Sequence, residues 1–439
     1  MRTLSGWGRY PRLPCEVAEP RDEAGVRAAL EGFGHVIARG NGRSYGDSAL
    51  GRRGTVVMRG LERLIDFDEE SGLLTCEAGT LLSDIVSVFL PRGWFVPVTP
   101  GTRFVTVGGM IAADVHGKNH HVAGSFGRHV AWLDLMLADG RVVRCSSQEN
   151  RDLFAATLGG MGLTGLILRA AFPLMRVETP FIKQETHKAA NLAEAMEIFE
   201  ATASSTYSVA WIDCVARGDR LGRSLVLLGE HLTRAEAPAD LPIPPAIAAR
   251  PRFSVPLDFP GIALNRWSVR AFNHFHYRRG RPGTAIVPLE PYFYPLDAIG
   301  GWNRIYGRRG FLQYQFVLPK PASREGMARI LRRIADHGSA SFLAVLKLFG
   351  PQDGLLSFPM EGYTLALDLP ASIANLNLLQ ELDAMVEDYG GRLYLAKDAR
   401  TSPASLRRGY PALSRFLEVR NRVDPGHRFR SVQSERLAL

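Results

Sequence analysis

The stretch from Pro97 to Phe126 constrains the fold more than any other part of this sequence. It holds five glycines, with Gly127 a sixth just beyond it, set among polar residues and three histidines, and it has almost no helical or strand periodicity. Glycine has no Cβ, so backbone N–H groups here can approach a ligand closely and form a concavity that suits phosphate or diphosphate. A structural loop crossing a sheet edge is the alternative. Long loops in compact domains are usually functional or disordered, which favours the cradle.

A second glycine turn, Gly42-Arg43-Ser44-Tyr45-Gly46, follows a predicted strand from His35 to Gly40. It matches the GxSxG nucleophile elbow of hydrolases, but that motif needs a helix directly after the serine. The glycines and polar residues that follow are poor helix formers. We therefore interpret it as a second phosphate-cradling turn. The longer segment, Pro97 to Phe126, does not have the GxGxxG spacing of a nicotinamide dinucleotide fold.

The order of predicted elements indicates an α+β fold rather than a doubly wound parallel sheet. In the first 176 residues, apolar spacing predicts a helix over Asp22–Phe33, a helix capped by Thr80 and stopped by Pro91 and Gly93, and a strand pair joined at Asp139-Gly140. Beyond Arg176, strands and amphipathic helices alternate more widely. Predicted strands there are YSVAWIDCV, FLQYQFVLP, ASFLAVLKLFG, YTLALDL and RLYLAKD, and Leu241–Gly283 is predicted to be irregular.

Composition describes an ordinary globular protein. The chain has 439 residues, 46% hydrophobic and 22% charged, which is enough for two or three domains. Met1–Pro20 lacks the apolar core of a secretory signal, and no window approaches the roughly eighteen apolar residues of a spanning helix. The four cysteines lie far apart with no CxxC, which favours a reducing compartment. We expect a cytoplasmic protein.

Basic residues exceed acidic ones and give a formal charge of +9. Part of the excess lies between Arg250 and Arg281, where five arginines alternate with aromatic residues: Arg266, Arg270, Arg278, Arg279 and Arg281 with Trp267, Phe272, Phe275 and Tyr277. Nucleic acid, an anionic membrane surface or phosphate, and a merely solvated basic face are the three interpretations. The resemblance described below makes us favour the membrane or phosphate.

Several polar side chains suggest chemistry. Four histidines, at 116, 120, 121 and 129, invite a metal site, but no HExxH or cysteine pair accompanies them and we predict none. Lys347 and Lys397 stand in apolar strands, where an unpaired ammonium is costly. They either point to solvent at strand ends or face a ligand. Gln313 and Gln315 share one strand face, which suits a pocket lining as well as a wet sheet face.

Long motifs resemble the decaprenylphosphoryl-β-D-ribose 2′-oxidase family, FAD enzymes of the vanillyl-alcohol oxidase (PCMH-type) superfamily. They are RGNGRSYGDSA from Arg39, the segment from Pro100 to Val130, GGMGLTGLI from Gly159, SFLAVLKLFGPQ from Ser341 with LSFP from Leu356, and GGRLYLAKDAR from Gly390. The resemblance covers nearly the whole chain. It implies a PCMH-type, two-subdomain FAD-binding domain over residues 1–176 and a substrate domain over 177–391 with a large antiparallel sheet flanked by helices. Residues 392–439 would return to the FAD domain.

Site residues follow from the same resemblance, position by position. FAD would be held by Gly40, Asn41, Gly42, Arg43, Ser44, Tyr45, Gly46, Asp47, Gly101, Thr106, Val107, Gly108, Gly109, Ala113, Asp114, His116, Ile167 and Tyr394. Substrate would contact Lys118, Trp211, Gln313, Gln315, Lys347, Phe349, Thr364 and Lys397. Catalysis would involve Lys397, His116 and Tyr45. Many relatives of this fold have a flavin-linked histidine where Tyr45 stands, so we predict non-covalent FAD.

The implied reaction oxidises the 2′-hydroxyl of a polyprenyl-phosphoryl-β-D-ribose to the 2′-ketone. The hydride would go to the flavin, and the proton to Lys397 with help from His116. A nicotinamide-dependent short-chain reductase would complete epimerisation to the D-arabinose donor of cell-envelope glycans. Ala366 replaces a family cysteine and Thr364 an asparagine, which leaves the sugar lipid open.

We expect the enzyme in the cytoplasm, with peripheral contact to the inner membrane through the basic, aromatic region. Two other functions stay open at this point. One is an FAD-dependent oxidase of alditols or other soluble sugars on the same fold. The other is a non-enzymatic protein that binds nucleic acid through the basic segment; we favour an enzyme that binds no nucleic acid.

Overall fold

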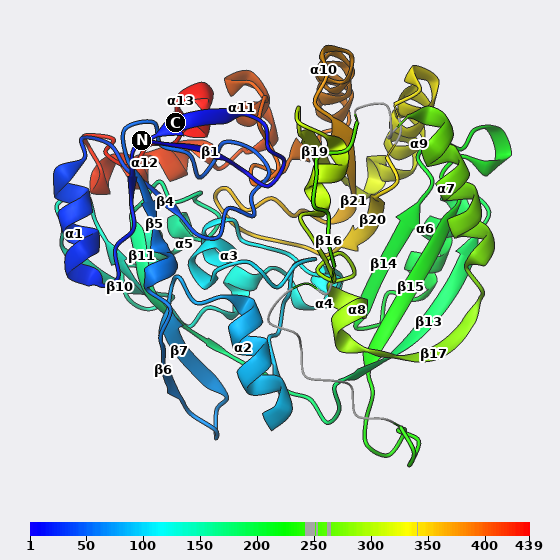
Figure 1. Ribbon diagram of the computed structural model, residues 1–439, viewed down its shortest axis with the longest axis horizontal. Coiled ribbons are helices and arrows are strands. Elements are labelled where there is room, and N and C mark those ends of the chain that lie inside the picture. Colours follow the sequence, from blue (N-terminus) through cyan, green and yellow to red (C-terminus); the bar gives the residue numbers. More distant parts are fainter. Residues whose placement is uncertain (242–250, 252, 261–264, 340) are drawn as a thin grey trace.

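The computed structural model describes residues 1–241, 251, 253–260, 265–339 and 341–439. Figure 1 shows the N-terminal elements, from blue to cyan, on one side of the molecule together with the red C-terminal helices. The green and yellow elements, a large sheet with helices against it, lie on the other side. The two ends of the chain lie beside each other in this view. The predicted α+β class, with a large antiparallel sheet, is confirmed.

The N-terminal part contains two main sheets. A parallel sheet of β3 (Val17–Ala18), β5 (Thr55–Val57) and β4 (Ile37–Arg39) lies near α1 (Glu23–Gly32). An antiparallel sheet has the order β10-β9-β11-β7-β6, with bounds Val142–Ser146, Trp132–Met136, Leu166–Pro173, Leu73–Glu77 and Leu64–Phe67. Asp22 caps α1, because its carboxylate accepts from the Gly25 amide at 2.7 Å. Gly140, at φ +81°, makes the predicted turn between β9 and β10.

The large sheet has eight strands in the order β17-β13-β15-β14-β20-β21-β19-β22. Their bounds are Gly283–Pro288, Phe181–Ala189, Ser224–His231, Tyr207–Ile212, Ala344–Phe349, Gly362–Pro370, Phe311–Pro319 and Arg392–Leu393. Helices α6 (Leu192–Ala201), α9 (Lys320–His337) and α10 (Ile373–Asp388) cover one face and bury an apolar core against it. The opposite face turns toward the N-terminal part, whose core it joins through Tyr207, Val317 and Phe349.

The C-terminal segment crosses back to the N-terminal part. It forms α11 (Pro403–Gly409), α12 (Leu413–Val423) and α13 (Val432–Leu437). The Arg430 amide donates to the Val36 carbonyl at 2.8 Å, and the Val36 amide donates to the Arg428 carbonyl at 2.7 Å. Arg422 pairs at 3.1 Å with Asp152 of α5 (Arg151–Thr157). The domain boundaries at 176 and 391 stay predictions.

Four local predictions are wrong. The glycine-rich stretch is not irregular throughout, because it forms two short helices, α3 (Val107–Ala112) and α4 (His120–Ala123). Thr80 does not cap the next helix; α2 (Leu82–Phe89) begins two residues later with Leu81 at the cap. The predicted strand RLYLAKD is only two residues long as β22, so Lys397 lies in the turn after it.

The fourth error is the irregular region over Leu241–Gly283. It contains α7 (Arg266–Arg279), which begins at a capping box formed by Asn265 and Ser268. The high arginine and aromatic content concealed this helix, because its apolar stripe is narrow. Residues 242–250, 252 and 261–264, including Arg250, lie outside the described residues. Within the described chain, no helix has the length and apolar character needed to span a bilayer.

Candidate active site

The sheet face that turns toward the N-terminal part is polar. In the strand register Lys347 pairs with Thr364, Gln313 with Asp368, and Gln315 with Ala366. Paired residues of antiparallel strands share a face, so these side chains form one continuous wall, the polar wall. The alternate residues of the same strands, Tyr314, Phe316, Leu346, Leu348, Leu365 and Leu367, pack into the helix-covered core. A buried polar surface of this extent calls for a polar ligand, because unmatched polar groups are costly to bury.

The turn from Gly40 to Asp47, which follows β4, lies against the segment that carries Lys397. The Tyr45 amide donates to the Ala396 carbonyl at 3.0 Å, and a Cβ on Gly46 would lie 1.6 Å from the carbonyl oxygen of Asp398. Only glycine fits such an approach. The contact brings the Tyr45 ring beneath Lys397, whose Nζ lies 3.9 Å from the ring centroid. The turn is not followed by a helix, so it has no nucleophile elbow.

This turn fits a phosphate. Gly42 adopts φ +63°, and the amides of residues 41 to 44 find no acceptor within the part of the chain that the structure describes. Arg43 Nε is buried without a partner, while its guanidinium carbon lies 4.0 Å above the Trp7 ring. Asn41 is held by a bond from its side-chain amide to the Phe104 carbonyl at 2.8 Å. Unmatched amides beside a left-handed glycine suit an anionic ligand.

The second glycine segment meets the first at Thr106. A Cβ on Gly40 would lie 2.2 Å from Thr106 Oγ1, and that hydroxyl caps α3 by accepting from the Gly109 amide at 3.2 Å. A Cβ on Gly109 would meet only this hydroxyl, and a Cβ on Gly101 would meet no heavy atom within 4 Å. The two turns therefore form one cradle that is open on a glycine-lined side. The cradle fits the diphosphate of FAD.

Some of the predicted cofactor residues have side chains that serve the fold, which leaves only their backbone free for a ligand. Val107 and Ile167 are buried in the N-terminal core. The Asp114 carboxylate accepts from the Gly127 amide at 2.8 Å and from the Ser357 hydroxyl. Asp47 is paired with Arg436. Of the remaining predicted residues, Gly108 lies in the first turn of α3, and the Ala113 carbonyl accepts from the Tyr394 hydroxyl at 2.9 Å.

Lys397 belongs to a network of buried polar groups. Gln313 donates to Asp368 at 2.7 Å and is hydrogen-bonded to the Tyr45 hydroxyl, and Tyr306 donates to Asp368 at 3.4 Å. Burial lowers the pKa of Lys397 to about 7, while Asp368 acts to raise it and Lys347 to lower it further. Burial raises the pKa of Asp368 to about 7. A lysine whose pKa lies near 7 can gain or lose a proton at cellular pH.

His116 contacts Gln315 with Nε2, 3.0 Å from the amide nitrogen. The amide nitrogen also donates to Thr364 Oγ1 at 3.3 Å, which assigns it as a donor. His116 Nε2 must then accept, so the proton sits on Nδ1, which is buried without a partner. Burial and then Lys347 hold the pKa of His116 well below its usual range, so the ring is neutral. Its Nδ1–H is a donor available to a ligand.

The remaining predicted substrate residues lie along the same wall. Phe349 packs on His116 and His120 with ring centroids 4.8 and 4.4 Å away. Trp211 pairs in register with Val345 and donates to the Phe342 carbonyl at 3.2 Å. Lys118 donates to the Tyr292 carbonyl and lies 4.0 Å from that ring's centroid. A small hollow lies at the β19 edge of the wall; Gln313, Gln315, Tyr394 and Lys397 line it together with Tyr314, Leu379 and Arg400 from the helix-covered side. The structure thus brings the predicted substrate residues to one wall.

Sequence reasoning missed Asp368 and the ion cluster behind Lys397. Arg436 of α13 pairs with Asp47 at 2.8 Å and with Asp398 at 2.7 Å, so the last helix ties the glycine turn to the Lys397 turn. The period-2 pattern could have revealed Asp368, since Thr364, Ala366 and Asp368 alternate on one face. No local pattern points to Arg436, because its partners lie far away in sequence.

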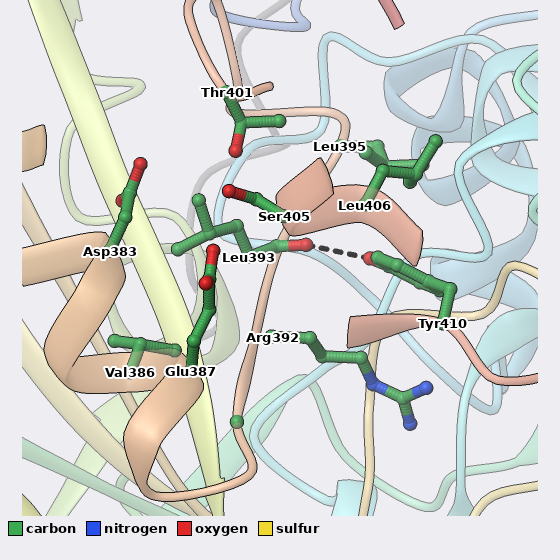
Figure 2. Close-up of a pocket in the computed structure, with 11 residues that line it drawn as sticks. Asp383, Val386, Glu387, Arg392, Leu393, Leu395, Thr401, Ser405, Leu406 and Tyr410 are labelled. Carbon is green, nitrogen blue, oxygen red and sulfur yellow. Dashed lines mark hydrogen bonds between the residues drawn. The ribbon is translucent and has the colours of Figure 1, made fainter. Parts of the chain in front are cut away.

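Figure 2 shows a second hollow, between α10, β22 and α11, where the Tyr410 hydroxyl donates to the Leu393 carbonyl at 2.6 Å. Asp383, Arg392, Thr401 and Ser405 also line it. None of the predicted site residues lines this hollow, so we assign the hollow to packing behind the Lys397 turn.

Comparison with known proteins gives the following similarities. Residues 14–146 match the family described as FAD binding domain, and residues 368–437 match D-arabinono-1,4-lactone oxidase. The whole chain is 39% identical over 450 residues to decaprenylphosphoryl-beta-D-ribose oxidase of Mycolicibacterium smegmatis, covering 98% of that protein. An uncharacterized Streptomyces coelicolor protein is 37% identical over 82% of this chain and all of its own length. L-gulono-1,4-lactone dehydrogenase of Mycobacterium tuberculosis is 22% identical over 96% of both chains.

Proposed function

Because the chain belongs to the decaprenylphosphoryl-β-D-ribose oxidase family and is an FAD-dependent oxidoreductase, we propose that it oxidises the 2′-hydroxyl of a polyprenyl-phosphoryl-β-D-ribose to the 2′-ketone. One observation supports this assignment most: Lys397, with a pKa near neutrality, stands over Tyr45 where the glycine cradle meets the polar wall. FAD, when bound, supplies the two-electron acceptor for the carbinol carbon. The protein's own residues supply position and proton transfer.

Lys397 accepts the hydroxyl proton in this proposal. In its neutral form Nζ has a lone pair, and its lowered pKa makes that form accessible at neutral pH. The ammonium that results is stabilised by the Tyr45 ring at 3.9 Å and by the Asp368 carboxylate. Gln313 fixes Asp368 through its 2.7 Å bond. The neutral His116 donates from Nδ1 to the ligand and orients Gln315, rather than accepting the proton.

FAD is held without a covalent bond in this proposal. The residue that faces Lys397 from the glycine turn is Tyr45, and burial raises the pKa of its hydroxyl well above the usual range. It therefore stays a neutral phenol whose hydroxyl is hydrogen-bonded to Gln313. The described residues of the turn include no histidine or cysteine that could form a flavin linkage.

The product defines the partner. A 2′-keto sugar lipid becomes the D-arabinose epimer when hydride returns to the opposite face, which needs a second, nicotinamide-dependent reductase. We propose a short-chain reductase as that partner, and the arabinosyl lipid as a donor for cell-envelope glycans. The supporting observation is the family to which the chain belongs.

The function is tested with the purified FAD-loaded protein under anaerobic conditions. We expect a short-chain polyprenyl-phosphoryl-β-D-ribose to bleach the flavin absorption, and mass spectrometry to find a product two hydrogens lighter. Acid precipitation should release FAD into the supernatant. Bleaching by free alditols or sugar lactones, and not by the sugar lipid, would instead support a soluble-sugar oxidase, to which the similarity with D-arabinono-1,4-lactone oxidase points.

We also propose that the enzyme is cytoplasmic and rests on the inner membrane through α7. Trp267 and Phe275 are 73% and 64% exposed on this helix, among arginines that have no ion pair within the described residues. Basic residues with exposed aromatic rings are typical of interfacial helices. The inner side of α7 reaches the polar wall, since His276 lies 4.6 Å from the Trp211 ring. A polyprenyl tail could therefore leave the site toward the membrane.

Replacing Arg270 and Arg278 by alanine is expected to weaken binding to vesicles with anionic lipid by about 30-fold, at roughly 1 kcal/mol for each arginine. Co-sedimentation measures the effect. Arg407→Ala with Arg415→Ala is the matched control, because it makes the same charge change on exposed positions of α11 and α12. Equal losses in the two double variants would show a general charge effect and rule out α7 as the contact.

A further inference from the structure

The site contains an unusual share of the chain's lysines. Only six of the 53 basic residues are lysine, and three of them, Lys118, Lys347 and Lys397, lie at this site. Two of the other three form surface ion pairs, Lys183 with Glu236 and Lys320 with Glu200, each at 2.9 Å. Arginine stays charged at any cellular pH, whereas a buried lysine can lose its proton. A buried lysine therefore suits an anion site that is filled only part of the time.

Lys118 and Lys347 have no acidic partner among the described residues. Lys347 projects from β20 on the polar wall beside Thr364, and no acceptor for its Nζ lies within the described chain. Lys118 is brought to the same wall, because its carbonyl accepts from the Ser208 amide of β14 at 2.9 Å. Strand β14 pairs with β20, so the two lysines come from neighbouring positions. Each of them is partly exposed although it lies inside the molecule.

We propose that Lys118 and Lys347 form an anion-binding subsite for the phosphodiester of the sugar-lipid substrate. This inference rests on the proposed function. The hydroxyl that is oxidised sits on the carbon next to the one that carries the phosphate, so the phosphate and the proton acceptor must lie close together. Lys347 meets this requirement, because its charge acts on both Lys397 and His116. The phosphate would thereby fix which hydroxyl faces Lys397.

Near neutral pH the empty subsite is expected to hold a fraction of neutral amine, about half at Lys118 and less at Lys347. Burial lowers the pKa of Lys118 to about 7 and that of Lys347 to about 8. The other groups that face them are Lys397, the neutral rings of His116 and His120, and the ring and backbone carbonyl of Tyr292, and none of these is an anion. A bound phosphate favours the ammonium forms, so the protein should take up protons when the ligand binds. A purely structural lysine would not produce this signal.

The test is calorimetric titration of the FAD-loaded protein with farnesyl phosphate, a lipid phosphate without the sugar. We expect the observed enthalpy to depend on the buffer's ionisation enthalpy, as proton uptake requires. Lys347→Met should weaken binding by about 10- to 100-fold, the range of a lost charge-assisted bond, and Lys347→Arg should restore most of it. Lys320→Met is the control and should bind as the wild type does.

The flavin spectrum of each variant separates the two possible sources of the anion. The subsite is supported if Lys347→Met binds farnesyl phosphate more weakly while its FAD content stays unchanged. Loss of FAD from that variant would assign the lysines to the cofactor's diphosphate and overturn the inference. So would wild-type affinity in both Lys347→Met and Lys118→Met. Failure of the proposed function is a different result, since it leaves the sugar lipid unoxidised whatever the affinity for farnesyl phosphate.

Discussion

Replacing Lys397 by methionine is expected to lower kcat by about 10²- to 10⁴-fold, the usual contribution of a positioned general base, while FAD stays bound. Methionine keeps the length of the side chain and its packing on Tyr45 but removes the proton acceptor. Anaerobic stopped-flow measurement of flavin reduction reports the oxidation step directly. Lys320→Met controls for the loss of a lysine, because that residue lies on the surface in an ion pair with Glu200.

The pH profile of the reduction rate gives the same hypothesis a second test. The neutral amine is the active form, so the rate should rise with pH through about 7. Asp368→Asn removes a negative charge that raises the pKa of Lys397, so the rise should move to lower pH. Lys347→Met removes a positive charge that lowers it, so the rise should move to higher pH. If neither variant shifts the pH at which the reduction rate rises, or if both shift it in the same direction, a different group accepts the proton.

Much of the fold could be predicted from local patterns. The helix over Asp22–Phe33 and the turn at Asp139-Gly140 were predictable because a side-chain cap and a glycine with positive φ act within a few residues. The α7 helix was not, because arginine, histidine and aromatic residues cover nearly all of its surface. Its start depends on a capping box at Asn265, which a search for hydrophobic periodicity does not detect.

Part of the candidate site could likewise be predicted from the sequence, and part of it could not. Gln313 and Gln315 were predictable as one strand face, and motif resemblance added Lys397 and Tyr45 without showing that they touch. The pairing of Asp47 and Asp398 through Arg436 joins residues almost 400 positions apart, so no window of sequence contains it. The protonation state of Lys397 was equally out of reach, since it depends on burial and on Asp368, which the sheet register brings nearby.

Gly46→Ala is expected to produce protein that retains little or no FAD and has lost about 2–4 kcal/mol of stability, toward the upper end for a single substitution. The added methyl carbon would lie 1.6 Å from the Asp398 carbonyl oxygen, and a backbone atom cannot rotate away as a side chain can. The glycine turn and the Lys397 turn must then separate. Flavin absorbance relative to protein measures retention, and thermal unfolding with and without added FAD measures stability.

Gly34→Ala is the matched control, because no heavy atom lies within 4 Å of the position its methyl group would take. Arg436→Met should resemble Gly46→Ala in a milder form, since it removes the ionic link between Asp47 and Asp398 but adds no clash. Excess FAD should raise the unfolding temperature of the wild type, because a ligand that binds only the folded state stabilises it, and should do so far less for Gly46→Ala. If Gly46→Ala retained all its FAD, the two turns could move apart without loss of FAD binding. The cofactor cradle and the proton acceptor would then be independent, contrary to the contact between Tyr45 and Ala396 on which the site is built.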